Sequence, residues 1–180
     1  MEVIGISGKA ESGKTTFSNF LKTELEGLGK KVVFVNYADI LKFICKQYYG
    51  WDGIKDEHGR QLLQTLGTDR GRQFYEGNYW IELLFRVLQL LHFDYDIAII
   101  GDCRFPNEIE WWYNEGIDIT SIRIVRPNYE SSLTKAQQMH SSEIALDNYN
   151  NFTYIVQNES LEELSASAEI IAKEIVDKQL

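Results

Sequence analysis

Eight residues near the start of the chain have the types and spacing of a loop that binds phosphate. Residues 8–15 read Gly-Lys-Ala-Glu-Ser-Gly-Lys-Thr and fit the pattern G-x-x-x-x-G-K-[ST] at every position. Glycines let the backbone turn its N–H groups inward around a phosphate, and a helix that begins near Gly13 adds the positive end of its dipole. Lys14 can reach β- and γ-phosphates, and the hydroxyl of Thr15 can ligate Mg²⁺. The pattern therefore predicts a nucleotide-binding loop.

The alternative is an ordinary glycine-rich turn with a solvated lysine. The context favours phosphate binding, because the run lies between an apolar segment at residues 3–7 and an amphipathic segment from about residue 14 to 27. We expect Glu11 to point to solvent, since a carboxylate aimed at a phosphate would repel it. The residues assigned to the nucleotide-binding loop are Gly8, Glu11, Ser12, Gly13, Lys14, Thr15 and Thr16.

An acidic residue follows a second apolar run. Residues 97–101 are Ile-Ala-Ile-Ile-Gly, and Asp102 comes directly after them. A carboxylate at the carboxyl end of a buried strand can hold Mg²⁺ directly or through water. Such an Asp can also simply cap the next turn, but the nucleotide-binding loop predicted at residues 8–15 favours the metal role. Cys103 is expected to be a small packed residue, because phosphoryl transfer needs no thiol.

Arginines are the candidates for neutralising transferred phosphate charge, because guanidinium groups bind phosphate bidentately. Those near expected loops or helix ends are Arg60, Arg70, Arg72, Arg104, Arg123 and Arg126. Each can also be a plain surface charge. Arg104 has the strongest local case, because it lies two residues after Asp102. Arg126 opens a polar segment that extends through Gln138 and can close as a lid, whereas Arg123 alternates within a strand and is expected to be structural.

Alternating strands and helices must position these groups. Short runs rich in Val and Ile predict buried strands at residues 3–7, 32–36, 97–101, 119–125 and 152–156. Apolar residues at three- and four-residue steps predict helices near residues 14–27, 38–49, 57–68, 79–92 and 160–178. This order is typical of an α/β domain with a mostly parallel sheet, in which ligands bind beyond the carboxyl ends of the strands.

Composition limits the classes of partner and compartment. The chain has 180 residues, 44% of them apolar, which is enough for the core of one domain. Its formal charge of −9 disfavours a nucleic-acid polymer or a membrane surface as partner. Two cysteines and three histidines show neither a disulfide framework nor zinc-ligand spacing. With no signal-peptide pattern and no membrane-spanning run, we expect a cytoplasmic protein.

Six blocks of the sequence together form a recognisable pattern. The blocks are Gly8–Thr15; Asn36-Tyr37-Ala38-Asp39 with Lys42; Arg60-Gln61-Leu62-Leu63-Gln64-x-Leu66-Gly67-Thr68-Asp69 with Arg72 and Trp80; Asp102-x-Arg104-Phe105-Pro106-Asn107-Glu108; Arg126-Pro127; and His140-x-Ser142-Glu143. This set resembles the deoxynucleoside monophosphate kinases of tailed phages and their prophage relatives. The likeness extends from Val3 to about Leu164, and the middle blocks are more specific than the loop.

The resemblance implies a fold and a set of site residues. The fold is a three-layer P-loop kinase fold with a mostly parallel five-stranded sheet, here as a single domain over residues 1–180. A helical insertion at about 37–92 would bind the monophosphate, and a lid would span about 126–140. The residues implied for the monophosphate site are Asp39, Lys42, Arg60, Gln64 and Arg72, with Arg104 on the acceptor or transferred phosphate. Arg126 would act from the lid, and Asn158 would approach the donor base. The block at residues 140–143 has no assigned role.

The implied activity is ATP-dependent phosphorylation of deoxynucleoside monophosphates, with Mg²⁺. The acceptor is already anionic, so its oxygen can attack the γ-phosphorus without a strong general base. The catalytic residues would then be Lys14, Arg104 and Arg126. They would align the reacting groups and neutralise the charge of the transferred phosphoryl group. Two alternatives stay open: a P-loop kinase of another small phosphorylated acceptor, such as a phosphomevalonate-type compound, and a nucleotide-binding regulator. The expected partners are small nucleotides, with a homodimer as an open possibility.

Overall fold

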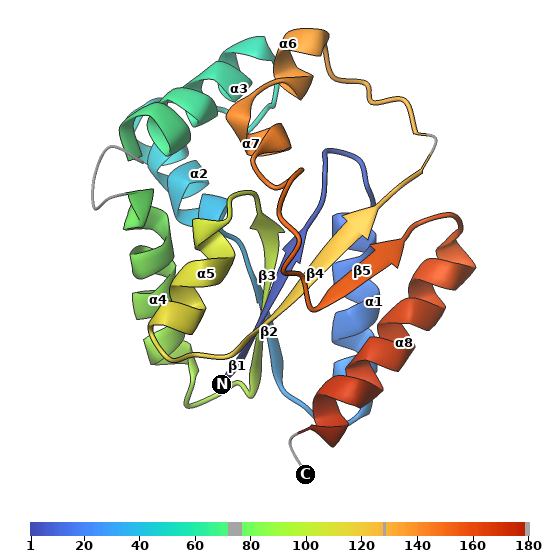
Figure 1. Ribbon diagram of the computed structural model, residues 1–180. Coiled ribbons are helices and arrows are strands. Elements are labelled where there is room, and N and C mark those ends of the chain that lie inside the picture. Colours follow the sequence, from blue (N-terminus) through green and yellow to red (C-terminus); the bar gives the residue numbers. More distant parts are fainter. Residues whose placement is uncertain (72–76, 128, 179–180) are drawn as a thin grey trace. The chain divides into compact units, whose positions relative to one another are not determined.

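The computed structural model describes residues 1–71, 77–127 and 129–178 and divides the chain into two compact units (Figure 1). The first comprises Met1–Val35 and the chain from Leu91 onward, and the second is Asn36–Leu90. Arg72, one of the residues implied for the monophosphate site, lies outside the described residues.

The first unit is built on one sheet of five parallel strands. The strands are β1 (Glu2–Ser7), β2 (Val32–Val35), β3 (Ile97–Cys103), β4 (Ile119–Val125) and β5 (Tyr154–Gln157). Their spatial order is β2-β3-β1-β4-β5, and every pairing is parallel. All five predicted strands are therefore confirmed, with small shifts of their ends. Because β1 is the central strand, the loop that follows it leaves the sheet at the middle of its carboxyl edge.

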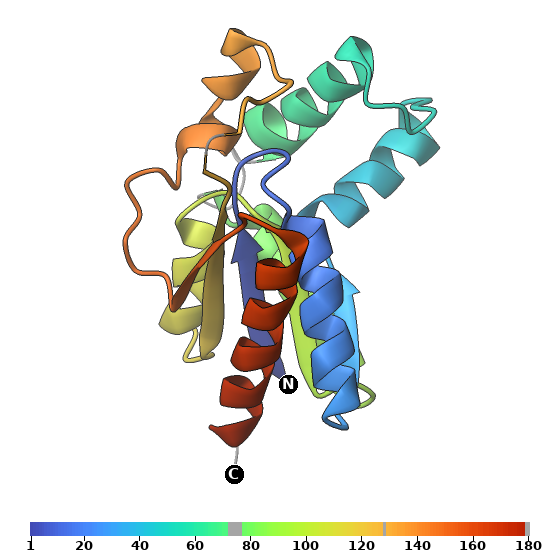
Figure 2. The same cartoon turned by 90° about the vertical axis from the view of Figure 1, so that its right-hand side faces the viewer.

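Helices cover both faces of this sheet. Figures 1 and 2 show α1 (Lys14–Gly27) and α8 (Leu161–Asp177) side by side on one face and α5 (Asn107–Asn114) on the other. The core under α1 and α8 joins residues of all five strands, including Ile4, Ile99 and Ile122, to Leu21 and Ile171. This arrangement confirms the three-layer α/β fold.

The long connection from β4 to β5 contains two short helices, α6 (Lys135–Gln138) and α7 (Ser141–Ile144). Each begins with a side-chain cap. The hydroxyl of Thr134 accepts a hydrogen bond from the N–H of Gln137 at 3.3 Å, and Nδ1 of His140 accepts one from the N–H of Ser142 at 3.3 Å. Such caps satisfy the exposed donors of a first turn, so they fix where a four-residue helix starts.

The second unit is helical. It contains α2 (Tyr37–Tyr48), α3 (Glu57–Gln64), a π-helix η1 (Thr65–Arg70) and most of α4 (Tyr79–Leu91). Its small core is formed by Leu41, Cys45, Trp51 and Leu66, against which Leu62, Leu63 and Trp80 pack.

The prediction of one α-helix over residues 57–68 is wrong in its second half, where the chain continues as the π-helix. The indole N–H of Trp80 donates to the carbonyl of Gly67 at 2.9 Å, and a Cβ at Gly67 would lie 2.6 Å from Cδ2 of Leu41. The wider turn thus places Gly67 close against α2 and exposes its carbonyl to Trp80.

Among the described residues, no helix is long and apolar enough to cross a membrane.

Candidate functional site

The loop between β1 and α1, residues 8–13, has a backbone path that depends on its two glycines. Gly8 has φ +153° and Gly13 has φ +97°, values that L side chains rarely adopt. A Cβ at Gly8 would lie 2.5 Å from Oγ of Ser12 and 2.7 Å from the carbonyl oxygen of Ile124. A Cβ at Gly13 would overlap the amide nitrogen of Asn158. The loop is therefore folded tightly on itself and against β4 and the end of β5.

No side chain of α1 itself compensates the positive end of the helix dipole. The N-cap, Gly13, has no side chain that could accept a hydrogen bond from the first N–H groups, and the first turn contains no acidic residue. In contrast, α8 is capped by Ser160, whose hydroxyl accepts from the N–H of Glu163 at 3.1 Å. Oγ of Ser12 is buried and has no hydrogen-bond partner among the described residues. An uncapped helix end beside a buried, unpaired hydroxyl fits an anionic ligand such as phosphate.

Lys14 fills the loop with its ammonium group. Nζ donates to the carbonyl of Gly8 at 2.8 Å and to that of Lys9 at 2.6 Å. Burial, together with the positive charge of Arg104, lowers the pKa of Lys14 to about 7, and the carboxylate of Glu143 acts in the opposite direction. A phosphate bound in the loop would stabilise the charged form of Lys14, because its negative charge would lie close to the ammonium group.

Arg104 lies directly after β3 and is held from two sides. The buried carboxylate of Glu108, at the start of α5, accepts the backbone N–H groups of Arg104 at 2.5 Å and Phe105 at 3.0 Å. The guanidinium NH1 donates to the carboxylate of Glu143 and to the carbonyl of Ser142 at 3.4 Å. Both the backbone and the side chain of Arg104 are thus fixed at the carboxyl edge of the sheet.

Glu143, in α7, connects this arginine to the loop. Its Oε1 pairs with Arg104, and its Oε2 accepts the backbone N–H of Ala10 at 2.9 Å. Four residues later, Asp147 pairs with Lys9 at 2.9 Å and with Arg123 at 3.3 Å. The segment after the lid therefore presents two carboxylates to the cations around the loop. The sequence marked Glu143 only as part of a block without a role.

Glu11 is exposed, as expected of a carboxylate that points away from a phosphate, and it has φ +62°. The sequence did not predict that its carboxylate also accepts hydrogen bonds from the chain after β4. The donors are the Tyr129 hydroxyl at 3.0 Å and Ser132, through N–H at 3.0 Å and Oγ at 2.6 Å. Since no phosphate repulsion arises on the outer side of the loop, the carboxylate can bind the lid segment instead.

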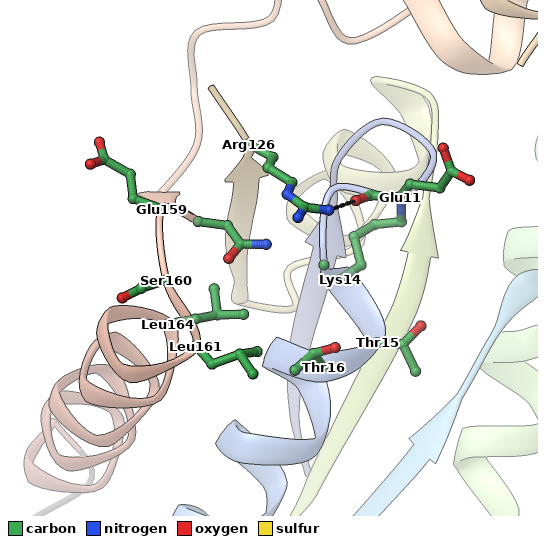
Figure 3. A pocket seen from close by; sticks show the side chains of 11 residues that line it. Glu11, Lys14, Thr15, Thr16, Arg126, Glu159, Ser160, Leu161 and Leu164 are labelled. Carbon is green, nitrogen blue, oxygen red and sulfur yellow. Dashed lines mark hydrogen bonds between the residues drawn. The ribbon is translucent and has the colours of Figure 1, made fainter. Parts of the chain in front are cut away.

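Arg126 joins the same contact. Its NH1 donates to the carbonyl of Glu11 at 3.4 Å, and its guanidinium carbon lies 4.3 Å from the centre of the Tyr129 ring. Figure 3 shows this side chain extending from the end of β4 to the loop, over a cavity of about 400 Å³. Leu161 and Leu164, from the start of α8, line the same cavity, as do Thr15 and Thr16.

Asn158 joins the loop to the end of β5. Its Nδ2 donates to the carbonyl of Ser12 at 2.8 Å, and its backbone N–H donates to that of Val125 at 2.7 Å. The side-chain amide therefore contacts the loop backbone, and the residue also lines the cavity.

The residues proposed for Mg²⁺ provide hard oxygen ligands. Thr15 is the second residue of α1, and Asp102 is a half-buried residue near the end of β3. Within residues 1–71, 77–127 and 129–178, no group of three His, Cys, Asp or Glu side chains could hold a metal ion. One hydroxyl and one carboxylate suit Mg²⁺, which keeps several waters and binds substrate phosphates, better than a metal that needs a full protein cage.

Four residues implied for the monophosphate site lie in described parts of the second unit: Asp39, Lys42, Arg60 and Gln64. Asp39 and Lys42 pair with each other at 2.9 Å on α2, and Asp39 also accepts the N–H of Asn36 at 3.0 Å as a helix cap. Arg60 and Gln64 are one turn apart on α3, and Nε of Arg60 donates to the carbonyl of Lys55 at 2.9 Å. Asp39 thus has a structural role at the start of its helix.

Comparison with known proteins identifies relatives of the chain. The model of the family described as deoxynucleotide monophosphate kinase matches residues 29–168. The deoxynucleotide monophosphate kinase of Enterobacteria phage T4 is 29% identical over 169 residues, which cover 91% of this chain and 64% of that protein. The deoxynucleoside-5'-monophosphate kinase of Escherichia phage T5 is 41% identical over 51 residues, 28% of this chain and 20% of that protein. The chain thus spans less than two thirds of these relatives.

Solved structures agree on the fold. The APS kinase of Mycobacterium tuberculosis, in complex with AMPPNP and APS, has a TM-score of 0.53 with 12% identity, over 98% of this chain and 95% of that one. A sugar kinase from a Janibacter species has a TM-score of 0.54 with 14% identity, over 93% and 92% of the two chains. These neighbours support the P-loop kinase fold, and the family match covers most of the sequence. The chain therefore belongs to the deoxynucleotide monophosphate kinase family.

Proposed function

We propose that the chain transfers the γ-phosphoryl group of ATP to a deoxynucleoside monophosphate, which yields ADP and a deoxynucleoside diphosphate. The observation that carries this proposal is the placement of Lys14 and Arg104 at one loop. The first fills the loop interior, and the second is held beside it through Glu143. Two cations beside an uncapped helix N-terminus can stabilise the negative charge of a phosphoryl group while it passes from donor to acceptor. The printed names of the phage relatives support the nucleotide acceptor.

The donor side is proposed to bind ATP through the β1–α1 loop. The phosphates would accept hydrogen bonds from loop N–H groups and from Lys14. They would also accept a hydrogen bond from the hydroxyl of Ser12, which has no partner among the described residues. The nucleoside part would occupy the cavity that Asn158, Thr16 and Arg126 line. Thr15 and Asp102 would hold Mg²⁺, which supplies charge neutralisation on the phosphates when bound.

The acceptor is an anion already, so its phosphate oxygen can serve as the nucleophile without a basic side chain. Lys14, Arg104 and Arg126 are proposed to align the reacting groups and to neutralise charge on the transferred phosphoryl group. Arg126 would contribute from the lid, the segment at about residues 126–140, which Glu11 already ties to the loop. This division assigns positioning and charge stabilisation to the protein, and it requires no covalent intermediate.

The acceptor is proposed to bind in the helical insertion, residues 37–92, of a single functional domain over residues 1–180. The monophosphate site would be lined by Asp39, Lys42, Arg60, Gln64 and Arg72. A base preference would come from neutral groups, because the basic side chains of this set would bind the phosphate that all nucleotides share.

The test is an ADP-release assay at fixed ATP and Mg²⁺ with three acceptor sets: the four common deoxynucleoside monophosphates, their ribo counterparts, and phosphomevalonate. We expect turnover with at least one deoxynucleotide, and none with a free nucleoside, which lacks the phosphate nucleophile. Turnover with phosphomevalonate alone would contradict the nucleotide acceptor. Slow ADP release that no acceptor accelerates would support a nucleotide-binding regulator instead. Equal rates for ribo and deoxy acceptors would remove only the sugar preference.

A further inference from the structure

We propose that Glu143 is a positioning residue for phosphoryl transfer: its carboxylate links the β1–α1 loop to Arg104 and orients the guanidinium before substrates bind. The inference rests on the proposed function, which it deepens by naming how one catalytic arginine is held. Glu143 lies in α7, outside the loop and outside the lid, and none of the chemistry proposed above assigns it a contact with substrate.

The two oxygens of the carboxylate have different partners. Oε2 accepts the N–H of Ala10 at 2.9 Å, and Oε1 accepts NH1 of Arg104. The Glu143 side chain is only 11% exposed and that of Arg104 28%, so solvent screens their pairing weakly. A carboxylate at this depth is costly unless both oxygens are satisfied, and here both are.

The way Arg104 is held leaves the useful part of its guanidinium available. NH1 is occupied by Glu143 and by the carbonyl of Ser142. Nε and NH2 have no hydrogen-bond partner among the residues that the structure describes. These two nitrogens form one flat edge, which matches two phosphate oxygens. Glu143 therefore fixes one side of the fork and leaves the opposite edge for a bidentate phosphate contact.

The segment around Glu143 has anchors of its own. Leu146 is buried at 3% exposure, and Asp147 pairs with Lys9 and Arg123. The cap between His140 and Ser142 fixes the start of α7. Removing the charge of Glu143 therefore leaves the segment attached. This independence separates an effect on Arg104 from a general loss of structure.

The test compares Glu143→Gln with Asp147→Asn as the matched control. Both remove one carboxylate from the same segment, but only the first touches Arg104. We expect Glu143→Gln to lower kcat about tenfold to a hundredfold, the range of one charge-assisted hydrogen bond, while KM for ATP stays within about threefold of wild type. Asp147→Asn should keep kcat within about threefold. In an Arg104→Ala background, Glu143→Gln should lower kcat no further, because its effect passes through the arginine.

A second readout does not depend on turnover. The Nε–H signal of Arg104, assigned by its loss in Arg104→Ala, should report an immobile guanidinium in nucleotide-free wild type and in Asp147→Asn. It should report a mobile one in Glu143→Gln. An unchanged signal together with unchanged kcat in Glu143→Gln would overturn the inference while wild-type turnover keeps the proposed function. A lower KM for ATP with no loss of kcat would show that Glu143 competes with phosphate, which also overturns it. A wild type that phosphorylates no acceptor would overturn the proposed function, and the inference with it.

Discussion

At the scale of single residues, Lys14 is the group whose ionisation should respond to the nucleotide. Its pKa is lowered to about 7 by burial and by the nearby guanidinium of Arg104. A bound triphosphate adds negative charge at Nζ and must raise that pKa. Above pH 7 the free protein holds Lys14 mostly neutral, so ATP binding has to take up a proton. Below pH 7 the lysine is already charged, and binding takes up none.

We therefore predict that the Kd for ATP rises as pH increases above about 7, by at most about tenfold per pH unit, the limit for one proton. Calorimetric titration between pH 6.5 and 9 measures this slope. Lys14→Arg is the matched control, because a guanidinium stays charged over the whole range. The slope should be absent in that variant. Parallel pH curves for the two proteins would show that Lys14 is not the titrating group.

At the scale of elements, the β1–α1 loop depends on a residue without a side chain at its junction with α1. Gly13 has φ +97°, and a Cβ there would overlap the amide of Asn158. We predict that Gly13→Ala weakens ATP binding at least tenfold, because the loop must open or Asn158 must leave Ser12. Gly27→Ala, at the end of α1, is the control, since its Cβ would meet nothing within 4 Å. That variant should keep its affinity for ATP and keep or raise its Tm. Equal affinity in both variants would contradict a tightly folded loop.

The lid segment should act mainly in the transition state. Arg126 is exposed and contacts the carbonyl of Glu11 at 3.4 Å, a weak interaction that a transferring phosphate can replace. We predict that Arg126→Ala lowers kcat by a larger factor than it raises the KM of the acceptor. Steady-state kinetics with the acceptor varied measure both. Lys135→Ala, an exposed cation of α6 in the same segment, should change neither. A rise in acceptor KM alone would place Arg126 in ground-state binding.

The elements that the sequence predicts well are those defined by local pattern. The amphipathic pattern over residues 14–27 predicts α1 with the bounds that the structure has, and the five Val- and Ile-rich runs all form strands. The π-helix was missed, because its wider turn depends on packing of Gly67 against Leu41 and on the bond from Trp80. No periodicity in residues 57–68 reports those distant contacts.

In the candidate site too, the sequence predicts features that follow from a local pattern and misses those that depend on distant contacts. A contiguous pattern identified the loop, and proximity to Asp102 identified Arg104. One partner of each carboxylate lies more than a hundred residues away along the chain: Ser132 for Glu11 and Ala10 for Glu143. A single sequence contains no pairing information at that range. The sequence therefore predicts the orientation of Glu11 from its charge alone, and it marks Glu143 only as part of a block without a role.

At the scale of the whole molecule, the proposed acceptor site would combine a phosphate contact that all nucleotides share with a separate base contact. Arg60 is exposed on α3, and its Nε is fixed by the carbonyl of Lys55. We predict that Arg60→Ala lowers kcat/KM about tenfold to a hundredfold, by a similar factor for every accepted base. Arg86→Ala, at an exposed arginine of α4, should leave kcat/KM unchanged. A loss confined to one base would show that Arg60 reads the base rather than the phosphate.

The whole chain has a formal charge of −9, yet cations gather around one loop: Lys9, Lys14, Arg104 and Arg123. The global field opposes binding of a polyanion, so a nucleotide must gain its affinity from this local cluster. Glu143 pairs with Arg104, and Asp147 pairs with Lys9 and Arg123. A small phosphorylated ligand can enter such a site, whereas a long nucleic acid would also meet the acidic remainder of the surface.

The most direct measurement of the central claim follows the phosphoryl group itself. ATP labelled with ³²P at the γ-position is incubated with the protein, Mg²⁺ and each deoxynucleoside monophosphate, and the products are separated by chromatography. We predict that the label appears in the deoxynucleoside diphosphate at the same rate as ADP forms, and that Lys14→Met abolishes both. Label that appears only as inorganic phosphate, at a rate independent of the acceptor, would contradict the claim that this protein is a deoxynucleoside monophosphate kinase.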